Sequence, residues 1–488
     1  MLNATAEHTD ETSVVESETG ASLILARDSS KREPFALFEE YMLLDDTPEY
    51  PMDPVFVLNF SERLDWTLAR HALLETIERH PTLRRRAHRG FARLFWVSTR
   101  RAPEIEYIDA DENPDAFNAS GFPNVRRLDL YSEPGLRVCY YESKRENRSR
   151  LLLQFHHAVS DGMGILAFIN DWSTLYSQSV GGLPSETRLP GVNEETLKER
   201  YQIGWNRRAY YRNYWHTWRS TRRFAFRFPR PLIPTPPFSK MGLEKEYPFA
   251  RTLTLSSEET ARYIQLAKKS GVTVNDALLC DYFLALDEWL RKVKGDARRG
   301  LLRVMAPINM RTSRHEGSPL ANIVSTVFLN RSRQALTRGR EAVLKSIAEE
   351  MRWVKEKEQR YDFLLILKAL HTFPGLLTMF LKMAVCRTSA VLSNLGRILD
   401  ASPVPRDSEG RLLLGTARLD GIDATSPIRY KTSLAIVALT YAGRLSLTAR
   451  YDARLIPDEE ARAFMDIYHS LISESVSLTY NVRVVLAI

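Results

Sequence analysis

Cysteine is scarce in this sequence, and the cysteines that occur are far apart. They are Cys139, Cys280 and Cys386, so the chain of 488 residues contains no Cys-x-x-Cys pair. Zinc sites built from thiolates and thiol–disulfide centres depend on such closely spaced cysteines. Their absence argues against both kinds of site. It predicts instead three buried, reduced thiols that pack as small apolar side chains.

The sequence also lacks an apolar run that could cross a membrane. A membrane span needs about 18 uninterrupted apolar residues, and the best candidate, residues 363–385, is broken by Lys368, Pro374 and Lys382 among others. The N-terminus has no basic start followed by an apolar core, so it does not resemble a secretion signal. It is rich in Glu, Ser and Thr, which predicts a disordered tail over residues 1–33.

The overall composition is that of a globular protein. Apolar residues make up 44% of the chain and charged residues 26%, which excludes a disordered or fibrous protein. At about 100–200 residues per domain, the length predicts two domains or two large subdomains. The net charge of +8 favours an acidic partner. Cofactor phosphates, an acidic carrier protein, an anionic membrane surface and nucleic acid all fit this description.

Helix and strand patterns are interleaved along the chain without the regular spacing of a doubly wound sheet. We predict an N-terminal subdomain over residues 34–185 and a C-terminal subdomain over residues 249–488, each mixing helices and strands. Between them, residues 186–248 form a basic, aromatic and proline-rich crossover. The fold class is therefore α/β with mixed sheets.

The chemistry is concentrated at the segment His156-His157-Ala158-Val159-Ser160-Asp161-Gly162. It follows a predicted buried strand, residues 150–155, and precedes an apolar-periodic helix, residues 164–176. Histidine has a pKa suited to a general base near neutral pH. Asp161 could be a second catalytic group, the partner of an arginine or the N-cap of the helix. We therefore take the histidine pair and Asp161 as the candidate catalytic residues.

The pattern His156-His157-x-x-x-Asp161-Gly162 resembles the HHxxxDG motif of the CoA-dependent acyltransferase superfamily. This superfamily includes chloramphenicol acetyltransferase, peptide condensation domains, alcohol acetyltransferases and wax ester synthases. Residues 272–277, 306–311 and 393–396 resemble further motifs of these proteins, so the resemblance extends from about residue 34 to the C-terminus. It implies a chloramphenicol acetyltransferase-like fold, with two similar subdomains around a central channel.

The resemblance also implies roles for individual residues. His157 would deprotonate the acceptor as general base, and His156 would be mainly structural. Asp161 would face away from the acceptor and pair with an arginine, for which Arg311 is the best candidate. Gly162 would allow a close approach of the backbone. Ser393 and Asn394 would donate hydrogen bonds near the oxyanion, or they are turn-forming residues before Gly396.

The implied reaction moves an acyl group from a CoA or carrier-protein thioester to a hydroxyl or amine, with the hydroxyl favoured. Acyl-CoA or acyl-phosphopantetheine is then a co-substrate, and the reaction requires neither a metal nor a permanently bound cofactor. The acceptor would be a small alcohol, an amine or a lipid. The alternatives are a free-standing condensation protein that forms an amide, and a catalytically silent module that docks a carrier or a lipid. We expect the protein in the cytoplasm, or peripheral to a membrane.

A second feature is the mixture of arginine and aromatic residues between positions 200 and 230. The arginines are Arg207, Arg208, Arg212, Arg219, Arg222, Arg223 and Arg227, and the tryptophans are Trp205, Trp215 and Trp218. One interpretation is an amphipathic helix with its aromatic face on the core and its arginines in solvent. The others are docking to a membrane or an acidic carrier, and, less favoured, nucleic-acid binding.

Overall fold

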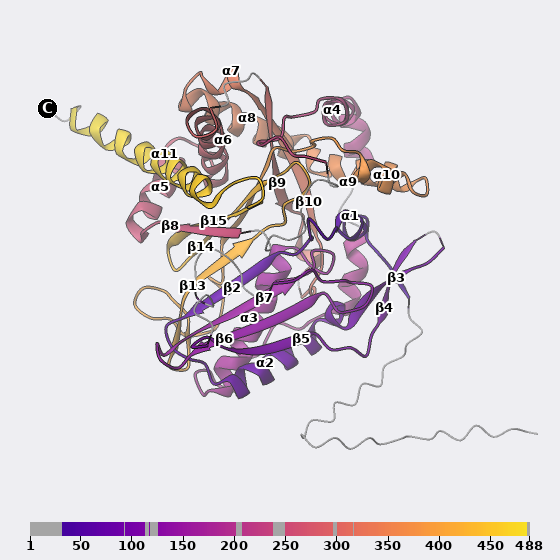
Figure 1. Ribbon diagram of the computed structural model, residues 1–488, viewed down its shortest axis with the longest axis vertical. Helices are drawn as coiled ribbons and strands as arrows, with labels where there is room; N and C mark the ends of the chain where they lie inside the picture. The colour runs from indigo at the N-terminus through magenta and orange to yellow at the C-terminus, as the bar shows by residue number, and fades with distance from the viewer. Residues whose placement is uncertain are drawn as a thin grey trace, which may run out of the picture.

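The computed structural model describes residues 32–91, 93–112, 117, 125–201, 207–237, 249–295, 300–315 and 317–485. The predicted N-terminal tail lies almost wholly outside the described residues, as does Trp205. Figure 1 shows the chain arranged around two large sheets, one in each half of the molecule. The predicted mixed α/β architecture with two subdomains is confirmed.

The first large sheet, here called the N-terminal sheet, has the strand order β12-β13-β2-β7-β6-β5. Its strands are β2 (Val55–Phe60), β5 (Glu104–Asp109), β6 (Leu136–Ser143), β7 (Arg148–Phe155), β12 (Leu413–Leu414) and β13 (Ala417–Thr425). Strands β6 and β7 form a hairpin, since they pair antiparallel from Leu136 opposite Phe155 to Ser143 opposite Arg148. Strand β2 covers the other edge of β7. The strand that ends just before the histidine pair is therefore central in its sheet.

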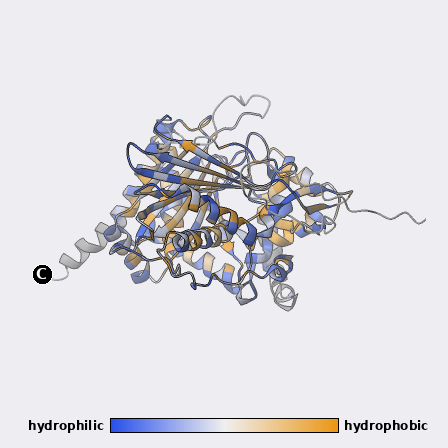
Figure 2. Cartoon of the chain, turned by 90° about the horizontal axis from the view of Figure 1, so that it is seen from below, coloured by the Kyte–Doolittle hydropathy of each residue, from blue (hydrophilic) through white to orange (hydrophobic). Residues whose placement is uncertain are grey.

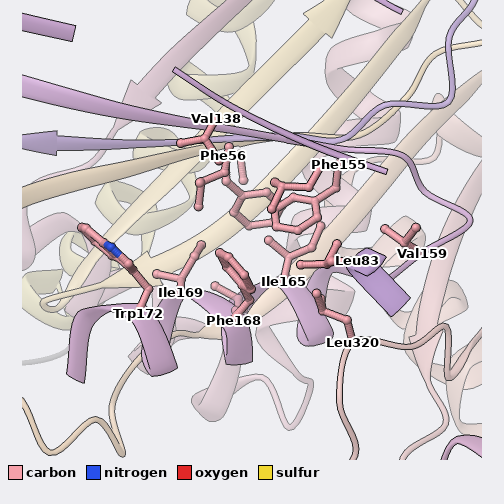
Figure 3. Close-up of a cluster of buried hydrophobic side chains, with 14 of the residues drawn as sticks. Phe56, Leu83, Val138, Phe155, Val159, Ile165, Phe168, Ile169, Trp172 and Leu320 are labelled. Atoms are coloured by element: carbon pink, nitrogen blue, oxygen red, sulfur yellow. The ribbon is translucent and has the colours of Figure 1, made fainter. Parts of the chain in front are cut away.

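Helices α2 (Trp66–Arg79) and α3 (Gly162–Ser179) pack on one face of this sheet. Alternation along β2 divides its side chains, since Phe56 and Leu58 face these helices and Val55 and Val57 belong to a smaller cluster on the other face. Figure 3 shows the main cluster, in which Phe56, Val138 and Phe155 of the strands meet Ile165, Phe168 and Trp172 of α3. This packing fixes the start of α3 relative to the end of β7.

The second large sheet, the C-terminal sheet, has the order β10-β9-β11-β14-β15-β8. Its strands are β8 (Phe249–Thr254), β9 (Leu301–Asn309), β10 (Val324–Ser332), β11 (Ala390–Arg397), β14 (Leu434–Tyr441) and β15 (Arg444–Tyr451). Its helices are α5 (Ser257–Lys269), α6 (Val274–Lys292), α8 (Arg340–Glu356) and α11 (Asp458–Val485). Strands β14 and β15 form a hairpin that turns at Ala442-Gly443, with φ of 47° and 73°. Figure 2 shows that most elements carry both polar and apolar residues, as elements with one face in a core do.

The chain crosses from one large sheet to the other more often than the sequence indicated. Strands β12 and β13 fall in the range predicted for the C-terminal subdomain, yet they join the N-terminal sheet. Strand β13 pairs antiparallel with β2, with Thr425 opposite Val55. It thereby covers an edge of β2 that would otherwise expose unpaired backbone groups. The predicted subdomain boundary at residue 249 therefore does not separate the strands of one sheet from those of the other.

The remaining described elements lie around the edges of the two sheets. A small sheet is formed by β1 (Glu33–Pro34), β4 (Leu94–Ser98) and β3 (Arg85–Arg89). Helices α1 (Leu37–Asp45), α4 (Arg207–Phe226), α7 (Arg333–Leu336), α9 (Asp362–His371) and α10 (Leu376–Lys382) complete the set of helices used below. Helix α4 contacts α9, and α1 contacts both α9 and α10.

The apolar segment after residue 362 forms two helices and not one. The chain bends by 115° between helices α9 and α10. Gly375 in this bend has a φ of 79°, a backbone conformation that favours glycine. Within the described residues, no single helix is long and apolar enough to span a membrane. The bent pair reaches that length and apolar composition only when its two halves are counted together. The three cysteines are buried and unpaired, as predicted. Burial raises the pKa of each thiol to about 12.

Candidate functional site

The histidine pair lies in the short connection between β7 and α3, and backbone hydrogen bonds hold this connection in place. The His156 amide donates to the Gly135 carbonyl over 3.0 Å, and the His157 amide donates to the Met52 carbonyl over 2.7 Å. The next bond is local, from the Val159 amide to the His156 carbonyl at 2.9 Å. Both histidines are therefore fixed by neighbouring strands and not by their side chains alone.

The side chain of His156 is fully buried and points into the N-terminal half. Its Nδ1 accepts from the Ala158 amide at 3.1 Å, and its Nε2 lies 3.9 Å from Asp46 Oδ2. Arg127 donates to the same carboxylate oxygen from Nε, at 2.8 Å, and from its terminal nitrogen, at 2.5 Å. Burial alone would raise the pKa of Asp46, but His156, the Met52 amide and Arg127 together lower it below the usual value. This environment suits a structural residue.

His157 has a different environment, because its side chain is half-buried. The Phe38 ring meets the His157 ring edge-on, with 6.1 Å between centroids. Burial lowers the pKa of His157, and the carbonyl oxygens of His157 and Ser160 and the charge of Asp161 oppose the shift only in part. A lowered pKa keeps the imidazole neutral near pH 7, which is the form that can accept a proton.

Asp161 connects the histidine segment to the C-terminal half of the molecule. Its Oδ1 accepts from the Gly164 amide at 3.0 Å, so it caps α3 as predicted. Its Oδ2 accepts from Arg311 at 2.8 Å and from the Ile323 amide at 2.8 Å. The predicted pairing with Arg311 is thus present. His157 is not among the hydrogen-bond partners of this carboxylate in the described residues, although the charge of Asp161 acts to raise the pKa of His157.

Asn322 is a second connection from the C-terminal half, and the sequence reasoning did not find it. Its side-chain amide donates to the carbonyl of His157 at 2.8 Å and to that of Ala158 at 3.0 Å. The residue is 1% exposed. The one signal in the sequence is a polar residue directly before an apolar strand, and this signal is too common to single out a position. Asp46, Arg127 and Phe38 were also missed, because no local sequence pattern distinguishes them from other residues of their type.

Gly162 and the Ser393-Asn394 pair lie on two elements that meet beside the histidine segment. A Cβ at Gly162 would approach Leu395 Cδ2 to 2.7 Å, so the start of α3 and the end of β11 pack closely. Asn394 Oδ1 accepts from the Gly396 amide at 2.9 Å, and Gly396 has a φ of 71°. This bond shows the turn-forming alternative in place for Asn394. In the part of the chain that the structure describes, no hydrogen bond joins Ser393 or Asn394 to His157.

The group Asp46, Asp53 and His156 has the spacing of metal ligands, since their ligand atoms lie within 4.8 Å of one another. Arg127 already supplies a positive charge to Asp46. Gln154 donates to Asp53 Oδ2 at 2.8 Å. Protein groups thus engage Asp46 Oδ2 and Asp53 Oδ2, while His156 Nε2 faces Asp46 Oδ2 at 3.9 Å and makes no hydrogen bond within the described residues. The cation of Arg127 already balances the charge of Asp46, as in a buried polar network.

Comparison with known proteins identifies the family. The profile of the condensation domain family matches residues 42–295, which is more than half of the chain. The chain therefore belongs to the condensation domain family, within the CoA-dependent acyltransferase superfamily that its motif resembles. A search of curated protein sequences gave no match.

Solved structures of condensation-type domains share the fold over nearly the whole chain. The first condensation domain of the calcium-dependent antibiotic synthetase, in complex with a substrate analogue, has a TM-score of 0.65 at 16% identity and covers 92% of this chain and 97% of its own. The epimerization domain from the third module of tyrocidine synthetase B has a TM-score of 0.62 at 14% identity, covering 93% and 98%. The starter condensation domain of rhizomide synthetase, a variant in complex with C8-CoA and Leu-SNAC, has a TM-score of 0.63 at 12% identity, covering 91% and 95%. At these identities the likeness establishes the fold, which is the predicted mixed α/β fold with two subdomains.

Proposed function

We propose that this protein transfers an acyl group from a thioester, carried by CoA or by a carrier protein, to an acceptor hydroxyl or amine. The observation that carries the proposal is the state of His157. Its backbone is fixed from both halves of the molecule by Met52 and Asn322, its ring is half-buried and its pKa is lowered. A rigidly placed neutral imidazole is what general-base catalysis requires.

In the proposed reaction His157 removes the proton from the acceptor as the acceptor oxygen or nitrogen attacks the thioester carbonyl. A bond forms between acceptor and carbonyl carbon, and the resulting tetrahedral intermediate carries a negative oxygen. Collapse of the intermediate breaks the carbon–sulfur bond. The imidazolium of His157 then returns the proton to the departing thiolate, so the products are an ester or amide and a free thiol. Ser393 remains a candidate donor to the negative oxygen.

We place His156 and Asp161 in positioning roles. His156 is buried against Asp46, and Asp161 is engaged by Arg311, Ile323 and Gly164. The acceptor hydroxyl remains favoured over the amine. The similar starter condensation domain, solved with C8-CoA and Leu-SNAC, supports thioesters as the first substrates to test. The three buried thiols agree with the proposed cytoplasmic setting.

The test is incubation of the full chain with a panel of acyl-CoA and acyl-carrier donors and alcohol or amine acceptors, followed by mass detection of the joined product. Release of thiol alone does not suffice, because hydrolysis also releases it. The same fold occurs in an epimerization domain, so each donor should also be analysed for a change of stereochemistry. A joined product that His157→Ala fails to form supports the proposal. Undiminished product with His157→Ala would overturn it.

A further inference from the structure

Helix α4 presents a stripe of aromatic residues to solvent. Trp215, Trp218, Arg222 and Phe226 follow one another at intervals of three and four residues, so they share one face of the helix. Trp215 is 70% exposed and Phe226 is 78% exposed. Tyr211 and Tyr214 precede them on the same face and are also exposed. The interpretation that placed the aromatic face of this segment on the core is wrong for these side chains.

The opposite face of α4 anchors the helix to the C-terminal half. Phe224 is buried and packs on Phe328 at 4.5 Å and on Phe363 at 6.2 Å between ring centroids. His216 meets the Trp353 ring of α8 at 4.9 Å. The exposed stripe is therefore the outward face of a helix that is fixed in place, and burying it requires something outside the described chain.

A second exposed apolar segment lies on the neighbouring helices α9 and α10. Phe373 in the turn between them is 66% exposed, and Met379 and Met383 are 60% and 46% exposed. Phe380 of α10 lies 6.5 Å from Phe224 of α4, ring to ring. Figure 1 shows α4, α9 and α10 together on one side of the molecule. Large apolar side chains exposed on adjoining elements indicate an interaction surface.

Apart from the buried Asp362 at the start of α9, the charges on these two segments are of one sign. The sequence has no aspartate or glutamate between Glu199 and Glu244, and none between Asp362 and Asp400. Among the side chains that the structure describes, the exposed cations of the two segments include Arg219, Arg222, Arg227, Lys368 and Lys382. The Arg222 guanidinium lies 5.4 Å from the centre of the Trp218 ring. Cations interleaved with exposed aromatic rings match the chemistry of an anionic lipid interface, where tryptophan enters the headgroup region and arginine binds phosphate.

We propose that the exposed face of α4 and the α9–α10 turn dock this protein on an anionic membrane surface. Nucleic acid accounts for the arginines and the rings, but it does not account for exposed methionines and phenylalanine on α10 and its turn. No single helix among the described residues is both long and apolar enough to span a bilayer, so the proposed contact is a peripheral one. The proposal does not depend on the proposed acyl transfer.

A series of packed rings connects the proposed docking face to the candidate site. Phe224 beneath the stripe contacts Phe363, Phe363 lies 6.5 Å from Phe38, and Phe38 lies 6.1 Å from His157. The packed rings therefore connect the proposed membrane contact to the side of His157 that faces Phe38.

The experiment is sedimentation of the full chain with vesicles of phosphatidylcholine, alone or mixed with phosphatidylserine, at low and high salt and without acyl substrates. We expect binding to the phosphatidylserine vesicles that weakens at high salt. Arg219→Gln with Arg222→Gln should weaken partitioning about fivefold per charge removed. Trp215→Ser with Trp218→Ser should weaken it about tenfold or more, and should abolish the quenching of tryptophan fluorescence by brominated lipid.

Matched controls come from α5, on the other side of the molecule (Figure 1). Arg262→Gln and Ile264→Ser change one exposed arginine and one exposed apolar residue there, and both should bind as the unmodified chain does. Thermal unfolding reports whether each variant is folded, and Phe226→Ser replaces the tryptophan variant if that variant is not. The proposal is overturned if the unmodified chain does not sediment with phosphatidylserine vesicles. It is also overturned if the α4 variants bind as well as the unmodified chain, or if the chain binds only single-stranded DNA or an acidic carrier protein.

Discussion

A carboxylate holds the histidine segment at each of its two ends, but the partners of the two carboxylates lie in different parts of the molecule. On one side Asp46 joins His156 to Arg127, and all three lie in the N-terminal half. On the other side Asp161 joins α3 to Arg311 and Ile323 in the C-terminal half, and Asn322 adds two bonds to the backbone of the histidine segment. The Asp46 side stabilises one subdomain, whereas the Asp161 side sets the position of the segment between two. The second side should therefore control activity more strongly.

The largest expected difference is between the two histidines themselves. His157→Ala should reduce acyl transfer by about 10²–10⁴-fold because it removes the general base, while the melting temperature changes little. His156→Ala leaves a buried gap beside Asp46 and should mainly lower the melting temperature. Steady-state rates on a confirmed substrate, together with thermal unfolding of both variants, test this. Equal loss of rate in two folded variants would contradict the assignment of different roles.

The next difference is between the two carboxylates. Asp161→Asn leaves Arg311 without its charged partner in a site that is mostly buried, and we expect a loss of about 2 kcal/mol in the free energy of unfolding together with a fall in kcat. Asp46→Asn should cost about 1 kcal/mol, because Arg127 is more exposed and can be solvated, and it should leave kcat largely unchanged. Urea unfolding and kinetics of both variants decide between them. A larger kcat effect at Asp46 would reverse the comparison.

A smaller effect is expected at Asn322. Asn322→Ala removes the donor to two carbonyl oxygens, and loss of these bonds should cost about 1–2 kcal/mol of unfolding free energy. Because the bonds reach the backbone of His157 itself, kcat should fall while KM for the donor stays close to normal. Asn330→Ala is a suitable comparison, since Asn330 lies on β10, the strand that follows Asn322, but bonds to Arg303 and not to the histidine segment. Equal kcat values for the two variants would remove Asn322 from the site.

The smallest expected effect is on pH dependence. Burial lowers the pKa of His157, so the acid limb of kcat/KM should have its midpoint below the usual histidine value of 6.5. The unfolded chain binds this proton more readily than the folded chain. Stability should therefore fall as the pH drops through 6.5, and the loss should be complete once the pH is below the folded-state pKa. In Phe38→Leu the ring is less covered, so the midpoint should move upward. A midpoint above 6.5 in the unmodified chain would contradict the burial argument.

Local patterns predicted the elements around the site well. Residues 150–155 and 164–176 were expected as strand and helix, and β7 and α3 contain them. Asp161 was expected as a cap because a short polar side chain stood just before an apolar-periodic run, and it is the cap. Its pairing with Arg311 could be inferred from the resemblance alone. The spacing of the two residues in the chain carries no information about their distance in space.

Other parts of the site could not be predicted. Asn322 and Asp46 stand in unremarkable sequence, and they matter because the two halves bring them to the histidine segment. Strand β13 was not predicted, and a strand pattern there would not have specified that it pairs with β2 in the N-terminal sheet. The face of α4 was uncertain for a related reason. An alternation of aromatic and basic residues predicts an amphipathic helix, but not which side meets the core.

Caps, periodicity and motifs are local properties of the chain, so they were enough to predict β7, the cap of α3 at Asp161, and the histidine pair as the candidate site. The contacts that join Asp161 and Asn322 to the other half, and the outward direction of the aromatic stripe of α4, exist only in the folded chain. These features depend on contacts between residues more than a hundred positions apart or on which surface is left uncovered. Both are set by the packing of the whole chain, and no local pattern encodes them.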